Sequence, residues 1–262
     1  MNRVRILGIL NVTPDSFSDG GRFVETAAAL EHARAMRAAG ADWIDVGGES
    51  SRPGAAPVAA DEERRRVLPI VEALAGDGIP VSIDTRRAAV AREAVAAGAR
   101  MINDVSALGD PEMAPAAAAA GVELVLMHMR GTPETMQADP RYGDVVAEVA
   151  EFLGAAAKKA LSAGVAADRI WVDPGIGFGK RLEHNIEILR RLAEFRRLGF
   201  PLLVGTSRKR FIGEILDRPV ERRLFGTAAS VAAAVLRGAD AVRVHDVAEM
   251  ADVVRLAERL RP

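Results

Sequence analysis

The chain has 262 residues, 49% of them hydrophobic and 27% charged, with a formal net charge of −1. This length suits one (β/α)8 barrel, one doubly wound sheet or two smaller domains, and the small net charge gives no general attraction to nucleic acid or a membrane surface. The absence of cysteine excludes disulfides and thiolate chemistry, and without a signal-like start or a membrane-length apolar run we expect a soluble cytoplasmic protein.

A repeated join between helix and strand organises the chain. Seven times a helix-like stretch ends in glycine and a short apolar run follows, at Gly40, Gly78, Gly98, Gly121, Gly164, Gly199 and Gly238. Glycine just past a helix supplies the left-handed cap conformation. Together with the apolar run at residues 4–10, the pattern predicts eight short strands of the continuously apolar kind found in buried parallel sheets.

The segments between these strands are predicted helices. Residues 27–39, 145–162 and 228–237 are rich in alanine, the best helix former. Two units, residues 86–97 and 111–120, are short, and Asp110-Pro111 is expected to begin the second of them. No linker or composition break divides the chain, so we expect one domain over residues 1–262. Eight strands in strict alternation with helices predict a single-domain (β/α)8 TIM barrel.

Polar side chains follow the predicted strands at the points where they end. In chain order these side chains are Asn11, Asp84, Asn103, Asp104, His128, Asp173, Ser207, Arg208, Lys209, Arg243 and His245. In a (β/α)8 barrel the carboxyl ends of all strands meet at one face, which carries the active site. Because burying so many polar groups without partners would be costly, the sequence predicts a polar ligand at this face.

The strand-end side chains fall into two chemical kinds. Asp84, Asn103 and Asp173 offer hydrogen-bond acceptors from three strands and suit a flat heterocycle with several N–H groups, because charge-assisted bonds are worth about 1.5–3 kcal/mol each. Donors gather after the last two strands, where barrels commonly hold phosphate; they are Ser207, Arg208, Lys209, Arg243 and His245. Lys209 is one of only four lysines among 35 cationic residues, which points to a specific use of its compact charge.

Two long loops follow the first two strands, at residues 12–23 and 47–57. Both combine glycine, proline, serine and charged residues, as expected of lids that close over a substrate. Phe17 and Pro53 would give these lids an apolar surface for a second, aromatic substrate.

Several segments resemble the signatures of the dihydropteroate synthase family. Residues 8–21 (GILNVTPDSFSDGG) and 45–54 (DVGGESSRPG) resemble its first two loops. Residues 82–85 (SIDT), 103–106 (NDVS), 173–180 (DPGIGFGK), 207–209 (SRK) and 243–246 (RVHD) resemble its other motifs, in the family's order and over essentially the whole chain. Ser51 stands where the family usually has threonine, so the hydroxyl is kept and a methyl group is lost.

The resemblance implies a transferase of folate biosynthesis. Its members join 4-aminobenzoate to (7,8-dihydropterin-6-yl)methyl diphosphate and release pyrophosphate, by a cation-like substitution without a covalent enzyme intermediate. Carried over by position, the implied pterin-binding residues are Asp84, Asn103, Asp173 and Lys209, of which Asp84, Asp173 and Lys209 would be catalytic. The implied diphosphate-binding residues are Ser51, Arg243 and His245, and the implied aminobenzoate-binding residues are Phe17, Arg52, Pro53 and Ser207. The resemblance also implies Mg²⁺ at Asn11 and a homodimer formed through the alanine-rich helices near the C-terminus.

Other readings stay open at this point. Asp84, Asp104 and Asp246 could cap the helices that follow their strands, and His128 is more simply a structural residue. A corrinoid methyltransferase that uses methyltetrahydrofolate would share the fold and the pterin pocket, but the basic cluster and the Phe17/Pro53 lid favour a diphosphate and an aromatic amine. A non-catalytic pterin-binding paralogue is a further alternative.

Overall fold

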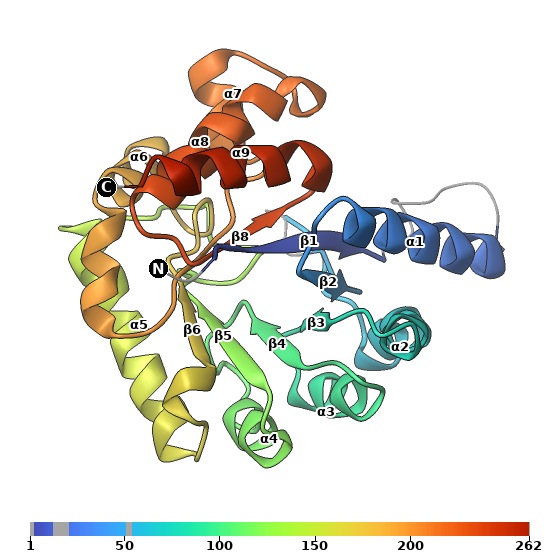
Figure 1. The fold of residues 1–262 in the computed structure, drawn as a ribbon. Helices are drawn as coiled ribbons and strands as arrows, with labels where there is room; N and C mark the ends of the chain where they lie inside the picture. The colour runs from blue at the N-terminus through green and yellow to red at the C-terminus, as the bar shows by residue number, and fades with distance from the viewer. Residues whose placement is uncertain (1–2, 13–20, 51–53, 262) are drawn as a thin grey trace.

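Eight parallel strands form a ring at the centre of the molecule (Figure 1) in the computed structural model, which describes residues 3–12, 21–50 and 54–261. The strands are β1 (Arg5–Asn11), β2 (Trp43–Gly47), β3 (Val81–Asp84), β4 (Met101–Asp104), β5 (Glu123–Met127), β6 (Ile170–Asp173), β7 (Leu203–Val204) and β8 (Ala241–Val244). Their hydrogen-bonded order is β6-β5-β4-β3-β2-β1-β8-β7. A bridge between Val172 and Leu202 links β6 to β7, so the predicted (β/α)8 barrel is confirmed.

The helices surround the ring of strands (Figure 1). They are α1 (Gly21–Ala38), α2 (Ala60–Gly76), α3 (Ala88–Ala96), α4 (Met113–Ala120), α5 (Val145–Ser162), α6 (Leu182–Arg190), α7 (Arg210–Leu216), α8 (Leu224–Leu236) and α9 (Val247–Arg259), with 3-10 turns at Ala167–Arg169, Leu192–Leu198 and Val220–Arg222. The short helix α7, inserted between β7 and α8, was not predicted. None of the described helices is long and apolar enough to cross a membrane.

Three predicted helix starts were wrong. α1 begins at Gly21, before the predicted start at residue 27, and α8 begins at Leu224, before the predicted start at residue 228. α4 begins at Met113, so Pro111 lies outside it. The Asp110 carboxylate accepts the backbone N–H of Glu112 at 3.0 Å and that of Ala88 at 2.8 Å. Asp110 therefore links the turn before α4 to the start of α3 and does not itself begin a helix.

The predicted helix-to-strand joins are confirmed. All seven glycines at these joins have positive φ, from 63° at Gly121 to 114° at Gly98. An alanine in this region would be strained, because its Cβ approaches the neighbouring carbonyl. The joins therefore mark where each helix stops and the chain turns back into the barrel.

Apolar side chains fill the middle of the barrel. Leu7, Met101, Val125, Trp171, Leu203 and Ala241 form one buried cluster there. At the amino-terminal end of β1, Arg5 pairs with Glu123 at 2.9 Å and lies 5.0 Å from the centre of the Trp171 ring. The amino-terminal end and the middle of the barrel are thus a packed core. A polar ligand must therefore bind at the carboxyl-terminal end of the strands.

Candidate active site

The strand registers bring the predicted acceptors to one rim. Asn11 of β1 is paired with Gly47 of β2, Gly47 with Asp84 of β3, and Asp84 with Asn103 of β4. Residues at matched positions on neighbouring parallel strands point to the same face of the sheet. Asn11, Asp84 and Asn103 therefore lie side by side at the carboxyl-terminal end of the barrel.

A buried ion-pair network crosses the barrel beneath this rim. The Arg243 guanidinium of β8 donates from Nη2 to Asp84 Oδ2 at 2.7 Å and from Nε to Asp45 Oδ2 at 2.6 Å. Asn103 donates from Nδ2 to the same Asp45 oxygen at 3.0 Å. Asp84 contacts Arg243 directly, and Asn103 is linked to Arg243 through Asp45, which was not among the predicted residues.

Asp84 is held in a setting that favours its protonated form. Burial is the main cause that raises its pKa to about 7; Arg243 opposes the shift, and the nearby carboxylates of Asp45, Glu63 and Asp104 act in the same direction as burial. The carboxyl therefore changes charge near neutral pH. A ligand that donates hydrogen bonds to Asp84 would favour the ionised form.

Asp173 and Lys209 form the second charged part of the rim. Asp173, at the end of β6, accepts the N–H of Gly175 at 2.7 Å through Oδ1. Burial raises its pKa, and the Lys209 ammonium opposes that shift. Lys209 Nζ donates to the carbonyl of Ile176 and lies 4.6 Å from the centre of the Phe178 ring. Burial lowers the pKa of Lys209 to about 8, with Asp173 opposing and Arg243 adding to the shift.

The glycine-rich loop after β6 packs tightly against the loop after β5. Gly175 has φ 66°, and a Cβ added to it would lie 1.9 Å from the carbonyl oxygen of His128, so no other residue fits. Lys180 lies buried at the end of this loop and donates to His128 Nδ1 at 2.8 Å, to Gly175 O at 2.9 Å and to Phe178 O at 3.0 Å. Lys180 thus ties the loop that carries Asp173 to the neighbouring strand end.

These contacts support the structural reading of His128. Burial lowers its pKa to about 2, helped by the Lys180 charge. The ring is therefore neutral, and its Nδ1 accepts a hydrogen bond from the Lys180 ammonium. Burial also holds the pKa of Lys180 well below its usual range. The position of Lys180 directly after three alternating glycines was the only sequence signal for this role.

Replacing Lys180 by methionine should destabilise the fold. Two buried acceptors and one partly buried acceptor would lose their donor, and each unsatisfied buried group costs about 1–3 kcal/mol. We expect the free energy of unfolding, measured by urea titration, to fall by about 3 kcal/mol or more. The exposed helix residue Lys159→Met is the control, and equal stabilities of the two variants would contradict the role of Lys180.

Ser207 and His245 meet at the ends of β7 and β8. Ser207 Oγ lies 3.0 Å from His245 Nδ1 and accepts the His245 backbone N–H at 3.1 Å. Arg208 was predicted to join this donor cluster, but its guanidinium is paired with Asp246, Nε to Oδ2 at 3.0 Å. The cation is therefore already neutralised by a carboxylate and is not directed at an anion in the site.

The three capping alternatives are wrong. Asp84 is paired with Arg243 and caps no helix. Asp246 stands at the start of α9 without a side-chain capping bond. Asp104 accepts the N–H groups of Ser106 at 2.9 Å and Leu108 at 2.7 Å. Asp104 thus stabilises the turn after β4, which is a structural role.

The predicted metal ligand Asn11 lies beside a gap left by Gly47. A Cβ on Gly47 would stand 3.7 Å from Asp84 Oδ2 and 3.8 Å from Asn11 Oδ1, so a longer side chain there would fill the space between them. Among the described residues no group of three or more histidine or acidic side chains is positioned to hold a metal ion. A single amide oxygen suits Mg²⁺, which commonly keeps several waters and takes further ligands from a phosphate-bearing substrate.

Four predicted residues lie outside the described part of the chain: Phe17, Ser51, Arg52 and Pro53. The described flanks of the second loop are anchored. Glu49 pairs with Arg86 at 2.7 Å and with Arg87, and the Gly54 N–H donates to Pro133 O at 3.0 Å. The loop therefore begins and ends against neighbouring elements on the same side of the barrel as the rim.

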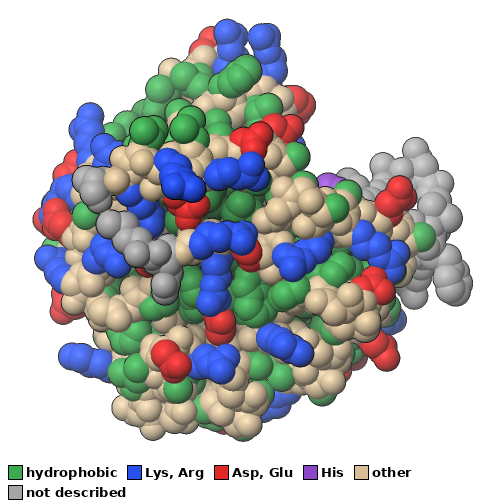
Figure 2. Space-filling view, in the orientation of Figure 1, with side chains coloured by type: hydrophobic (Ala, Val, Ile, Leu, Met, Phe, Trp, Pro, Cys, Tyr) green, Lys and Arg blue, Asp and Glu red, His purple; other side chains and the backbone are tan. Residues whose placement is uncertain are grey.

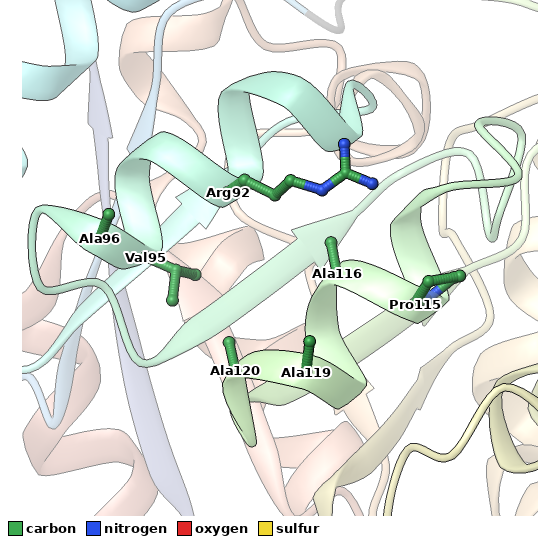
Figure 3. A pocket seen from close by; sticks show the side chains of 7 residues that line it. All are labelled: Arg92, Val95, Ala96, Pro115, Ala116, Ala119 and Ala120. Carbon is green, nitrogen blue, oxygen red and sulfur yellow. The ribbon is translucent and has the colours of Figure 1, made fainter.

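An apolar groove of about 520 Å³ lies elsewhere, on the outer surface between α3 and α4 (Figure 3). Its lining is mainly alanine side chains, with Val95, Pro115 and, as the single charged residue, Arg92. It contains none of the predicted acceptors or donors. The polar rim, and not this groove, is the candidate active site.

The chain is similar to known proteins over nearly its whole length. Residues 7–245 match the family described as "Pterin binding enzyme". The dihydropteroate synthase of Synechocystis is 50% identical over 261 residues, which covers 98% of this chain and 90% of that protein. A structure of Yersinia pestis dihydropteroate synthase with a sulfonamide drug complex has a TM-score of 0.93 at 45% identity, covering 98% and 94% of the two chains. The Xanthomonas albilineans dihydropteroate synthase with 4-aminobenzoic acid has a TM-score of 0.93 at 46% identity, covering 99% and 93%.

Proposed function

This chain belongs to the dihydropteroate synthase family of transferases, and from that premise we propose the part that each rim residue plays. The reaction of folate biosynthesis joins (7,8-dihydropterin-6-yl)methyl diphosphate and 4-aminobenzoate into 7,8-dihydropteroate and pyrophosphate. The observation that carries the assignment of roles is the buried network in which Arg243 contacts Asp84 at 2.7 Å and Asp45 contacts both Arg243 and Asn103. In this network, side chains that can accept hydrogen bonds from a heterocycle lie in the same site as a cation that can bind an anionic group.

We propose that Asp84, Asn103 and Asp173 bind the pterin ring. Their oxygens can accept its N–H groups, and the two carboxylates favour positive charge on the ring as the bond to the leaving group breaks. Lys209 donates a hydrogen bond to the Ile176 carbonyl, near Asp173. We propose that the ammonium donates instead to an acceptor atom of the pterin ring when the ring is bound. Asp84, Asp173 and Lys209 would thus stabilise the transition state, and no protein nucleophile is needed.

We propose that Arg243, His245 and Ser51 bind the diphosphate. Arg243 uses Nε and one Nη on carboxylates, and its remaining N–H groups are available to phosphate oxygens. Ser207 contacts His245 at 3.0 Å, which supports adjacent sites for the diphosphate and for aminobenzoate. Phe17, Arg52, Pro53 and Ser207 would hold the aromatic amine so that its nitrogen attacks the methylene carbon as pyrophosphate departs.

Mg²⁺ at Asn11 would supply a charge that stabilises the departing pyrophosphate when it is bound there. Asn11 offers one amide oxygen beside the gap at Gly47. The diphosphate and water would have to supply the other ligands. Metal binding should therefore depend on the diphosphate, since one amide oxygen alone is a weak site.

Release of pyrophosphate tests the whole proposal. We expect purified protein to release it from the pterin diphosphate at a rate that rises with 4-aminobenzoate until it saturates, and to form an equal amount of dihydropteroate. Pterin binding without pyrophosphate release would identify a non-catalytic paralogue. Methyl transfer from methyltetrahydrofolate to a corrinoid, without pyrophosphate release, would identify the methyltransferase alternative.

Binding of 4-aminobenzoate should depend on pyrophosphate and Mg²⁺. The anion would neutralise Arg243, accept a hydrogen bond from His245 and complete the wall against which the aromatic amine lies. We expect calorimetric affinity for 4-aminobenzoate to rise at least tenfold when both are present, which is a difference of about 1.4 kcal/mol. Removing Mg²⁺ with a chelator should reverse this gain. Equal affinity under all conditions would refute the ordered binding.

We further propose a homodimer formed through α7, α8 and α9. These helices carry exposed apolar side chains, and Figure 2 shows hydrophobic residues gathered over this upper part of the molecule. The exposed residues are Ile215, Leu216, Val220, Phe225, Leu236, Leu256 and Leu260. Phe225 is 86% exposed, and a patch of this kind commonly marks a protein–protein interface.

Phe225→Glu should convert the dimer to a monomer. A buried carboxylate without a partner in each subunit would cost several kcal/mol. Light scattering after size-exclusion chromatography should give twice the chain mass for the wild type and the single mass for the variant. Leu161→Glu, at an exposed site on α5, serves as the control. A monomeric wild type would refute the interface.

A cytoplasmic location stays a prediction from the sequence, and fractionation of cells would test it.

A further inference from the structure

Asp45 is the buried carboxylate of the network that the roles above do not use. It lies in β2, beside Ile9 of β1 and Ser82 of β3, and its side chain is 0% exposed. Its two polar contacts come from β4 and β8, neither of which is a neighbour of β2 in the sheet. The side chain therefore points into the barrel, one layer below the rim that carries Asp84.

One oxygen of Asp45 receives both contacts. Asn103 donates to Oδ2 at 3.0 Å and Arg243 donates to Oδ2 at 2.6 Å. The other oxygen, Oδ1, has no hydrogen-bond partner among the described residues. Asp45 thus accepts hydrogen bonds from two side chains that would bind opposite ends of the pterin diphosphate.

The contact with Asn103 determines which way its amide faces. An ionised carboxylate only accepts hydrogen bonds, so it pairs with the amide nitrogen and repels the amide oxygen. With Nδ2 on Asp45, the acceptor Oδ1 faces away from the carboxylate. Asn103 therefore offers an oxygen to a ligand, and a ring that presents an N–H at this position is preferred over one that presents a bare acceptor.

The contact with Arg243 fixes the plane of the guanidinium. Asp45 holds Nε and Asp84 holds Nη2, so a planar group is anchored at two points by two strands. Such pre-orientation lowers the entropy lost when the remaining N–H groups bind an anion.

We infer that Asp45 is a positioning residue, which fixes the amide of Asn103 as an acceptor and holds Arg243 in the orientation for the anionic group. The inference rests on the proposed function, since it concerns the ligand of Asn103 and Arg243. It makes Asp45 a determinant of ring specificity that touches no substrate.

Asp45→Asn is the direct test. The new amide has a donor and an acceptor, so it can meet Asn103 in either orientation. We expect KM for the pterin diphosphate to rise at least tenfold, while KM for 4-aminobenzoate at saturating pterin diphosphate changes less than threefold. Ser82→Ala is the matched control, because Ser82 is buried at the same height of the barrel and its hydroxyl has no partner among the described residues. A variant within threefold of the wild type in both constants would overturn the inference.

A double-mutant comparison isolates the path through Asn103. In the wild-type background Asn103→Ala should raise KM for the pterin diphosphate strongly, and in the Asp45→Asn background its further effect should fall below threefold. Effects that simply multiply would show that Asp45 does not act through Asn103.

A second measurement needs no variant of Asp45 and covers the case in which that variant fails to fold. The chain has only four asparagines, so protein labelled with ¹⁵N at asparagine gives few side-chain amide signals, and Asn103→Ala assigns one of them. We expect one Asn103 Nδ2 proton to be shifted downfield and to stay so when the pterin diphosphate binds, because the bond to Asp45 persists. Its return to the position of a free amide on binding would overturn the inference. A wild-type protein that releases no pyrophosphate would instead refute the proposed function, and the NMR measurement would still test the Asp45 contact.

Discussion

Replacing Asp173 by asparagine should lower kcat/KM for the pterin diphosphate about a thousandfold. The buried carboxylate already accepts the Gly175 N–H through Oδ1, so the second oxygen is the one available to the ring. In the variant an NH₂ group replaces one of these oxygens and opposes a donor. That oxygen can accept two N–H groups of the ring, and loss of two charge-assisted bonds at about 2 kcal/mol each corresponds to roughly three orders of magnitude in rate.

Steady-state kinetics with varied pterin diphosphate measure this effect. Asparagine has nearly the shape of aspartate, so the thermal unfolding curve should change little. The control is Asp168→Asn, which alters an exposed acidic residue just before β6. Wild-type turnover by Asp173→Asn would remove Asp173 from the set of catalytic residues.

Lys209→Ala should reduce kcat/KM by a comparable factor of about a hundred to a thousand. The ammonium opposes the buried charge of Asp173, and none of the described neighbours supplies a cation at the same place. Removal takes away the largest charge that favours the ionised form of Asp173, while Lys180 and Arg243 still act on it, so the cost should stay below the about 3–5 kcal/mol of a fully unpaired buried charge. The exposed residue Lys158→Ala is the matched control. Activity within threefold of the wild type would contradict the role of Lys209.

The pH dependence of kcat/KM gives Lys209 a second test. Asp84 must be ionised to accept N–H groups, and burial raises its pKa to about 7, so activity should rise through that pH. Lys209 must be protonated, and burial lowers its pKa to about 8, so activity should fall above that pH. The profile should be bell-shaped. Lys209→Arg keeps its charge at all these pH values, and its profile should therefore lose the alkaline limb, whatever its absolute rate.

The fold could be predicted from the sequence because its signals are local. Each helix-to-strand join needs a residue that tolerates positive φ, and glycine appears at all seven positions. The strand ends could be predicted as well, since a short apolar run that stops at a polar residue marks the carboxyl-terminal face of a barrel. The rim positions of Asp84, Asn103 and Asp173 follow from that pattern, while their chemical roles came from the family resemblance.

Side-chain partners were much less predictable. Arg208 was expected among the anion-binding donors and is paired with Asp246, 38 positions later in the chain. Lys180 was seen as a residue that follows a loop, yet its ammonium is buried against His128, 52 positions earlier. No local pattern encodes either partner.

The sequence by itself determined the alternation of strands and helices, the end of the barrel at which polar groups gather, and the family to which the chain belongs. Only the tertiary structure decided that Asp45 lies between Asn103 and Arg243, the latter 198 positions away. The reason is physical. Secondary structure depends on neighbours along the chain, whereas a buried charge takes its partner from whatever strand faces it once the ring of strands has closed.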